Sequence, residues 1–143
     1  MARYVTTVES RLPREKAFAY IADFSNSQAW DPGVREARRI DAGALRVGSA
    51  FDLVARFAGR DVPLHYEIVA YEPPRRVVLE ARRPGFTSRD EIHVEDAGAR
   101  SVLHYDARLT FDGIGRFAEP VLQRIFLRIG DRAAAGLREA LNP

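Results

Sequence analysis

The sequence contains no cysteine, and it has a single tryptophan and a single methionine. Without cysteine, disulfides, thiolate catalysis and cysteine-based metal sites are excluded. The sequence also lacks an excess of one charge, since 22 basic residues are interleaved with 20 acidic ones. A nucleic-acid-binding surface needs basic residues gathered with few acids among them, so this balance argues against a nucleic-acid partner.

Long apolar runs are absent as well. The first ten residues hold no apolar segment of the secretory kind, and no apolar stretch approaches the length that spans a bilayer. We therefore expect a cytoplasmic protein without stable membrane insertion. The composition is that of a globular protein, with 46% apolar and 29% charged residues. A length of 143 residues predicts one domain, residues 1–143, and leaves a homodimer open.

The N-terminal region predicts a strand followed by a broken helix. Residues 2–10 are rich in β-branched residues and partly alternate, which is typical of a strand. Residues 13–24 carry apolar residues at helical spacing behind a proline that suits a first helical turn. Residues 25–30 favour a second short turn of helix. The Asp-Pro pair that follows ends this turn, because a residue before proline is disfavoured in helical geometry, and Trp30 stands directly at the break.

Beyond this break the period of apolar residues changes to two, which predicts six antiparallel strands. The first of them, residues 34–40, is charged and suits the edge of a sheet. The other five alternate apolar and polar residues between turn-forming segments, and they cover residues 49–57, 62–71, 77–81, 86–95 and 101–111.

The alternation also predicts how these strands pair. Turns at Gly59-Arg60, Pro73-Pro74 and Ala97-Gly98 set apolar face against apolar face, and a slip of one residue would reverse every side chain. In the last hairpin, opposite charges favour Arg89 facing Asp106 and Glu91 facing His104. This register predicts that Asp90 lies opposite Tyr105 on the inner face.

A long C-terminal helix is predicted to begin between Arg116 and Pro120 and to run to about Leu141. Gly130 and Gly136 interrupt it, and they either allow a close approach to the sheet or permit a bend. The element order predicts an α+β fold. A curved antiparallel sheet of about seven strands wraps around the C-terminal helix, with two short helices between strands 1 and 2. Such an arrangement tends to leave a pocket between sheet and helix.

Five segments together resemble the SRPBCC superfamily, in its polyketide cyclase/dehydrase and lipid-transport-like branch. They are "RLPREKAFAYIADFSNSQAWDPGV", "VGSAFDL", "PLHYEIVAYEPPRRVVLE", "EDAGARSVLHYDARLTF" and "GLREAL". The resemblance implies a START-like or Bet v 1-like helix-grip fold. It also implies a deep, mostly apolar cavity that binds a hydrophobic small molecule. Members of the superfamily range from carriers to cyclases, so the fold alone does not choose among them.

Strand parity and the helical stripe predict which side chains face this cavity. The expected ligand-binding residues are Trp30, Phe51, Leu53, Tyr66, Ile68, Leu79, Phe86, Ser88, Asp90, Ile92, Tyr105, Leu109, Leu122, Phe126 and Ile129. Tyr66, Asp90 and Tyr105 are the candidates for a catalytic role. Each tyrosine either orients a ligand or satisfies a backbone group, and Asp90 either serves a ligand or reaches water near a strand end. Trp30 either caps the core or contacts ligand at the cavity mouth.

Metal and cofactor chemistry are not expected. His65, His93 and His104 each stand between two inward-facing residues, so parity places them on the outer face of the sheet. Three histidines on separate strands, without carboxylates at ligand spacing, argue against a metal site. Nothing in the sequence indicates a cofactor.

Three functions remain open from the sequence. The first is binding or transport of a hydrophobic or aromatic small molecule, which needs only the cavity. The second is a polyketide cyclase or dehydratase, in which a tyrosine or arginine polarises a carbonyl. Aromatic polyketide cyclases of the superfamily generally carry a histidine-rich segment after the first helix. The corresponding residues 25–32 contain Trp30 but no histidine, which ranks this function second. The third is a protein-partner module with an exposed apolar patch.

Overall fold

The structure is a computed structural model. It describes the backbone of residues 1–143 and every side chain except those of residues 114 and 115. In chain order its elements are β1 (Ala2–Ser10), α1 (Arg14–Ala22), the 3-10 turn η1 (Phe24–Asn26), α2 (Ser27–Trp30), β2 (Val34–Arg39), β3 (Ala50–Phe57), β4 (Arg60–Glu72), β5 (Arg76–Arg83), β6 (Phe86–Ala97), β7 (Arg100–Phe111), the 3-10 segment η2 (Gly113–Ala118) and α3 (Glu119–Ala140).

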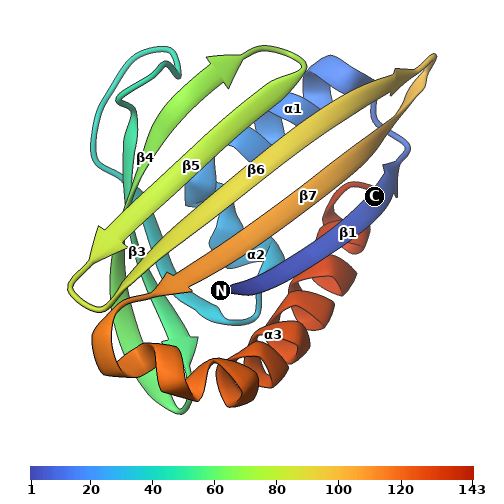
Figure 1. The fold of residues 1–143 in the computed structure, drawn as a ribbon. Coiled ribbons are helices and arrows are strands. Elements are labelled where there is room, and N and C mark those ends of the chain that lie inside the picture. The colour runs from blue at the N-terminus through green and yellow to red at the C-terminus, as the bar shows by residue number, and fades with distance from the viewer.

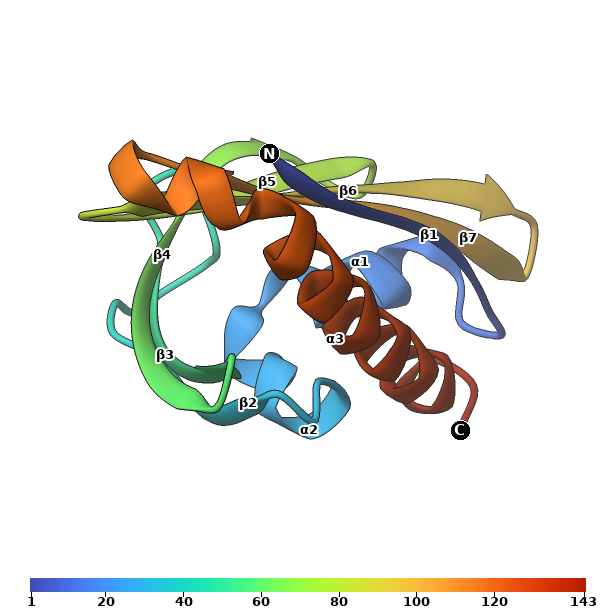
Figure 2. The ribbon, with the colours of Figure 1, turned by 60° about the horizontal axis from the view of Figure 1, so that its bottom comes forward.

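The strands form one antiparallel sheet in the order β1-β7-β6-β5-β4-β3-β2. The charged β2 lies at an edge, as its sequence predicts. Figure 1 shows the sheet from its outer side, and Figure 2 shows β2 and β3 curling toward the helices. The long helix α3 crosses the concave side of this sheet (Figure 2). The helix-grip fold predicted from the sequence is confirmed. Among the described residues, no helix is long and apolar enough to cross a membrane.

The broken helix near the N-terminus follows from its capping side chains. Asp23 ends α1 in extended geometry, and its carboxylate accepts a hydrogen bond from the Ser25 amide at 3.0 Å. The Ser27 hydroxyl donates to the Phe24 carbonyl at 2.6 Å, which shapes the turn into α2. Asp31 is again extended, as expected for the residue before a proline. The break therefore redirects the chain into β2 and fixes Trp30 on the inner side.

Two glycines bring α3 close to its neighbours. A Cβ atom on Gly136 would lie 1.9 Å from the Trp30 carbonyl oxygen. A Cβ atom on Gly130 would lie 2.4 Å from ring carbons of Tyr4 on β1. Both distances are far below a van der Waals contact, so a Cβ atom at either position would force the group that it meets to move. Close approach is thus what these glycines provide.

The first and last elements of the chain are joined directly. The Ser10 hydroxyl, at the end of β1, donates to the Leu141 carbonyl at 2.9 Å. The Asn142 amide donates to the Glu9 carbonyl at 2.9 Å. These bonds hold the end of α3 against the end of β1.

The register of the β6–β7 hairpin differs from the prediction. The structure pairs Arg89 with Arg108 and Glu91 with Asp106, while Asp90 faces Ala107. The turn is Gly98-Ala99, with Gly98 at a φ of +80°, which suits a two-residue hairpin turn.

Neighbouring strands explain why like charges can face each other in this hairpin. The Arg89 guanidinium donates to Glu80 on β5 at 3.1 Å. The carboxylate of Asp106 accepts a hydrogen bond from Arg3 on β1 at 2.8 Å. Arg89 and Asp106 are therefore paired with groups outside the hairpin, and opposite charge across the hairpin does not set its register.

Buried apolar side chains form two clusters on the concave side. The larger cluster packs α1 and α2 against the middle of the sheet, and its fully buried members include Ile21, Phe51, Ile68, Leu79, Ile92 and Leu103. The smaller cluster lies toward the start of α3 and contains Ala2, Leu109 and Phe111, with Phe57, Phe86, Leu122 and Phe126 packed against it.

Candidate functional site

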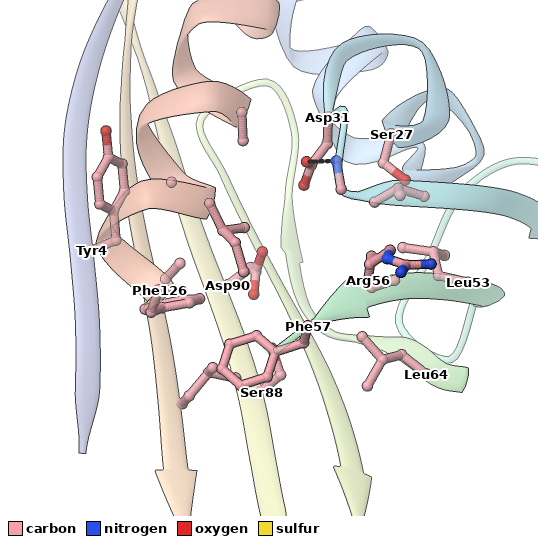
Figure 3. A pocket seen from close by; sticks show the side chains of 18 of the residues that line it. Tyr4, Ser27, Asp31, Leu53, Arg56, Phe57, Leu64, Ser88, Asp90 and Phe126 are labelled. Atoms are coloured by element: carbon pink, nitrogen blue, oxygen red, sulfur yellow. Dashed lines mark hydrogen bonds between the residues drawn. The ribbon is translucent and has the colours of Figure 1, made fainter. Parts of the chain in front are cut away.

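A cavity of about 200 Å³ opens between α3 and the concave face of the sheet (Figure 3). Its wall takes residues from both apolar clusters, such as Tyr66 from the larger one and Phe126 from the smaller one. An engineered apolar cavity of about 150 Å³ binds benzene, so this volume suits a molecule of at least one aromatic ring.

Four polar side chains interrupt the apolar wall on β4, β6 and β7. The Tyr105 hydroxyl donates to the carboxylate of Asp90. The hydroxyls of Tyr66 and Ser88 are hydrogen-bonded to each other at 2.7 Å. Both tyrosines thus bond to side chains inside the cavity and not to backbone groups. All four residues are buried and all four line the cavity.

Asp90 lies in the middle of β6 and only 8% of it is exposed, so the alternative in which it reaches water at a strand end is wrong. Burial raises the pKa of Asp90 to about 7, because the charged form loses its hydration. The hydrogen bond from Tyr105 acts in the opposite direction, and the nearby charge of Asp31 raises the pKa further. Burial also raises the pKa values of Tyr66 and Tyr105 well above the ordinary value, so both hydroxyls stay protonated.

A second carboxyl group, Asp31, enters the cavity from the loop between α2 and β2. One of its oxygens accepts a hydrogen bond from the Gly33 amide at 2.8 Å, drawn as a dashed line in Figure 3. Burial raises the pKa of Asp31 to about 6. Figure 3 shows the carboxyl groups of Asp31 and Asp90 directed into the same space from opposite walls. Sequence reasoning treated Asp31 only as the residue that ends the helix, because a loop residue has no periodicity that would point it inward.

Trp30 belongs to the core and to the cavity wall at once. Only 4% of it is exposed, and its ring packs edge-on against Phe24 at 6.4 Å and against Tyr105 at 6.1 Å between centroids. Its ring also lines the cavity, so the structure supports both alternatives considered for it. The indole Nε1 is buried without a hydrogen-bond partner among the described residues.

The structure places ten of the fifteen expected ligand-binding residues in the cavity wall: Trp30, Leu53, Tyr66, Phe86, Ser88, Asp90, Tyr105, Leu109, Phe126 and Ile129. Phe51, Ile68, Leu79 and Ile92 also point inward, but they are packed in the larger cluster and do not line the cavity. Leu122 packs against the smaller cluster.

Sequence reasoning missed several wall residues besides Asp31. Leu64 and Phe57 share the inward parity of residues that the prediction did name, so alternation could have found them. Tyr4 enters from β1, where its hydroxyl donates to Asp131 on α3 at 2.8 Å. Arg56 lies at the exposed rim, where it is paired with Asp61 at 3.5 Å.

The histidines lie on the outer face of the sheet, as parity predicts. The side chains of His65, His93 and His104 are each nearly half exposed. A hydrogen bond with Asp52 is the largest cause of a raised pKa at His65. In the part of the chain that the structure describes, no three or more side chains of the metal-ligating types are grouped to hold a metal ion.

These features define a protein of the helix-grip class, in which a curved sheet and a long helix enclose an apolar cavity. The sequence matches the family described as "Polyketide cyclase / dehydrase and lipid transport" over residues 1–142. The chain therefore belongs to this family, as its resemblance to the superfamily implies. A search of the curated proteins finds no match.

Solved structures with the same fold come from different classes of organism. A START superfamily protein from Mycobacterium smegmatis superposes with a TM-score of 0.80 at 12% identity, over 99% of this chain and 97% of that one. The ZhuI aromatase/cyclase from Streptomyces sp. R1128 gives a TM-score of 0.78 at 13% identity, over 97% and 92%. The major latex-like protein 151 from Panax ginseng gives 0.71 at 10% identity, over 99% and 98%. At such identities the likeness establishes the fold alone.

Proposed function

We propose that this protein binds a hydrophobic small molecule that carries an aromatic ring, and that the cavity under α3 is the binding site. The observation that supports this most is an apolar cavity of about 200 Å³ with a small set of converging polar groups. Pockets of this composition are typical of small-molecule sites, where apolar walls supply affinity and a few polar groups fix orientation. The family, which includes lipid transport in its description, supports the same function.

The test compares two alanines on α3 that differ in which side of the helix they occupy. Ala133 lines the cavity, whereas Ala135 is exposed on the outer side. Ala133→Phe fills the cavity, so we expect it to abolish binding of a neutral apolar fluorescent probe such as N-phenyl-1-naphthylamine. Ala135→Phe is the matched control and should bind the probe as the wild type does. Equal binding by both variants would show that the probe occupies another surface.

Native mass spectrometry of the freshly purified protein addresses the natural ligand. We expect a bound species of a few hundred daltons in the wild type, identified by comparing the native mass with that of the denatured chain. The Ala133→Phe variant should carry none. A natural ligand retained by this variant would place the site outside the cavity.

A second function, cyclisation or dehydration of a polyketide-like substrate, is favoured by the Asp90–Tyr105 pair. A carboxyl group with a pKa of about 7 can both accept and donate a proton near neutral pH, as general acid–base catalysis requires. When Ser88 is the donor in the bond that it shares with Tyr66, the Tyr66 hydroxyl is free to donate to a carbonyl oxygen. Under this function Asp90→Asn keeps ligand binding but loses turnover of a linear poly-β-ketone, followed by mass spectrometry as loss of water. Unchanged turnover in the variant would remove Asp90 from the reaction.

A further inference from the structure

The cavity contains two carboxyl groups whose capacity to accept hydrogen bonds is mostly unused. This observation refines the proposed function and rests on it. A carboxylate offers about four acceptor positions. The described residues supply Asp90 with a hydrogen bond from Tyr105, and Asp31 with one from the Gly33 amide. The Ser88 hydroxyl is hydrogen-bonded to Tyr66 and also lowers the pKa of Asp90 as a neighbouring donor, so it occupies at most one more acceptor position of that carboxyl group. Both carboxyl groups thus retain positions directed into the cavity (Figure 3).

The cavity wall provides little positive charge to balance these two groups. Arg56 is the basic residue among those that line it, and its guanidinium pairs with Asp61 and donates to the Gly59 carbonyl at 3.5 Å. The side chain of Arg56 is also 53% exposed, so water screens its charge from the interior. The titratable groups that face Asp90 from the surrounding elements are Asp31, Tyr66 and Tyr105, while Asp106 acts on it more weakly from the outer face of the sheet. These groups are acidic or neutral, and a carboxylate ligand would add a further negative charge.

Aromatic rings surround the same part of the cavity. Trp30 and Tyr105 pack edge-on at 6.1 Å, and Phe24 and Tyr66 pack edge-on at 5.2 Å between centroids. All four rings line the cavity. Aromatic faces attract cations through their quadrupole, and aromatic rings combined with carboxylates form recurring sites for ammonium groups.

We propose that this cavity selects apolar molecules that carry a primary ammonium group, which Asp31 and Asp90 hold between them, and that it rejects apolar carboxylates. An ammonium group has three N–H donors and a positive charge, so it can bond to both carboxylates and neutralise part of their charge. A hydroxyl has a single donor and no charge, so it can serve only one of them.

The test uses four probes that share a phenylpropyl body: phenylpropylamine, phenylpropanol, phenylpropanoate and propylbenzene. Isothermal titration calorimetry measures each affinity, and quenching of Trp30 fluorescence reports binding next to the only tryptophan. We expect the amine to bind about tenfold tighter than the alcohol, and the carboxylate to bind weakest. An alcohol or a carboxylate that binds as tightly as the amine would overturn the inference and leave the proposed function intact. Failure of all four probes, the hydrocarbon included, would overturn both.

Carboxyl-to-amide variants separate charge from shape. Asp90→Asn and Asp31→Asn should each weaken binding of the amine about tenfold and leave propylbenzene within about twofold of the wild type. Glu95→Gln is the matched control, because Glu95 pairs with His104 on the outer face and does not line the cavity. A parallel loss of amine and hydrocarbon binding would indicate altered packing and would contradict the proposed role of the two carboxylates.

The pH dependence gives an independent readout. The amine stays mainly protonated up to pH 8. The carboxyl groups of Asp31 and Asp90, with pKa values of about 6 and about 7, ionise between pH 5 and pH 8. Affinity of the wild type for the amine should therefore rise from pH 5 to pH 8, and affinity for propylbenzene should stay constant. The rise should be smaller in Asp90→Asn. An amine affinity that is independent of pH would contradict the inference.

Discussion

The two ends of the concave face are built from the same apolar residue types, yet one end is solid and the other is hollow. Near α1, side chains such as Ile68 and Phe51 have no more than 1% exposure. Under α3, Leu64 and Phe126 are only half-buried and border the cavity. The difference lies in the covering elements. The buried face of α1 packs directly on the first end, whereas α3 spans the second end and α2 only borders it. The cavity therefore follows from how the helices cover this end of the sheet, since the residue types at the two ends are the same.

The largest expected effect on stability is on β4, the strand that runs from the packed end of the concave face to the end with the cavity. On β4, Ile68 is packed in the solid end and Leu64 borders the cavity. We expect Ile68→Ala to lower the free energy of unfolding by about 4 kcal/mol, because it leaves a void in close packing. Leu64→Ala should lower it by only about 1 kcal/mol, because its neighbours already face open space. Urea denaturation measures both, and equal losses would show that the two ends are packed alike.

The two glycines of α3 give the next comparison. Gly136→Ala should lower the free energy of unfolding by about 3 kcal/mol, because its Cβ would meet the rigid Trp30 carbonyl at 1.9 Å. Gly130→Ala should cost about 1 kcal/mol or less. There the Cβ meets a tyrosine side chain beside the cavity, and the gain in helix propensity offsets part of the strain. Urea denaturation of both variants checks the order, and a larger loss at Gly130 would show that Tyr4 cannot move.

The buried carboxyl of Asp90 gives the third comparison, through pH. The ordinary pKa of this group is 3.8, and its pKa in the folded protein is about 7. At a pH between these two values the folded protein keeps the proton, whereas the unfolded chain has released it. The stability of the wild type should therefore fall as the pH rises from about 4 to 7. Asp90→Asn has no proton to lose. We expect it to be more stable than the wild type at pH 8, by on the order of 4 kcal/mol, and nearly equal to it at pH 4. Equal stabilities at pH 8 would mean that the carboxylate is hydrated in the fold.

The smallest effect is expected for a carboxyl on the outer face. The pKa of Asp106 is lowered, and the hydrogen bond from Arg3 is the largest cause. The pKa shift of Asp106 is therefore opposite in sign to that of Asp90. Its contribution is present above the ordinary pKa and is lost as the pH falls through the lowered one. Asp106→Asn should cost below about 1 kcal/mol at pH 7, and the difference should vanish in strong acid. A loss that persists at low pH would trace to packing and not to charge.

Much of the fold could be predicted from the sequence, because alternation and helical spacing are direct consequences of burial on one face. The edge position of β2 and the outward histidines followed from the same pattern. The β6–β7 register did not, because Glu80 and Arg3 come from strands outside the hairpin. Charge pairing within a hairpin cannot account for partners that only the folded sheet brings near.

The cavity was harder to predict than the fold. Parity showed that Phe51 and Tyr66 both point inward, but it does not show which one borders space and which one borders packed atoms. The contact between Asp90 and Tyr105 was predicted from a register that is wrong, because the residue opposite Asp90 is Ala107; parity showed only that both side chains point inward. Asp31 was not found, because its orientation depends on a loop geometry set by Gly33.

The hydrogen bonds that join Ser10 and Asn142 to the opposite end of the chain have a consequence for biosynthesis. The helix that covers the cavity is synthesised after all seven strands of the sheet, whereas its partner β1 is synthesised before the other six (Figure 1). During translation the concave face therefore waits uncovered until α3 is released, and its apolar surface is exposed to chaperones and to other nascent chains. A small molecule already present in the cell could meet the open sheet at this stage and be enclosed as the helix closes over it.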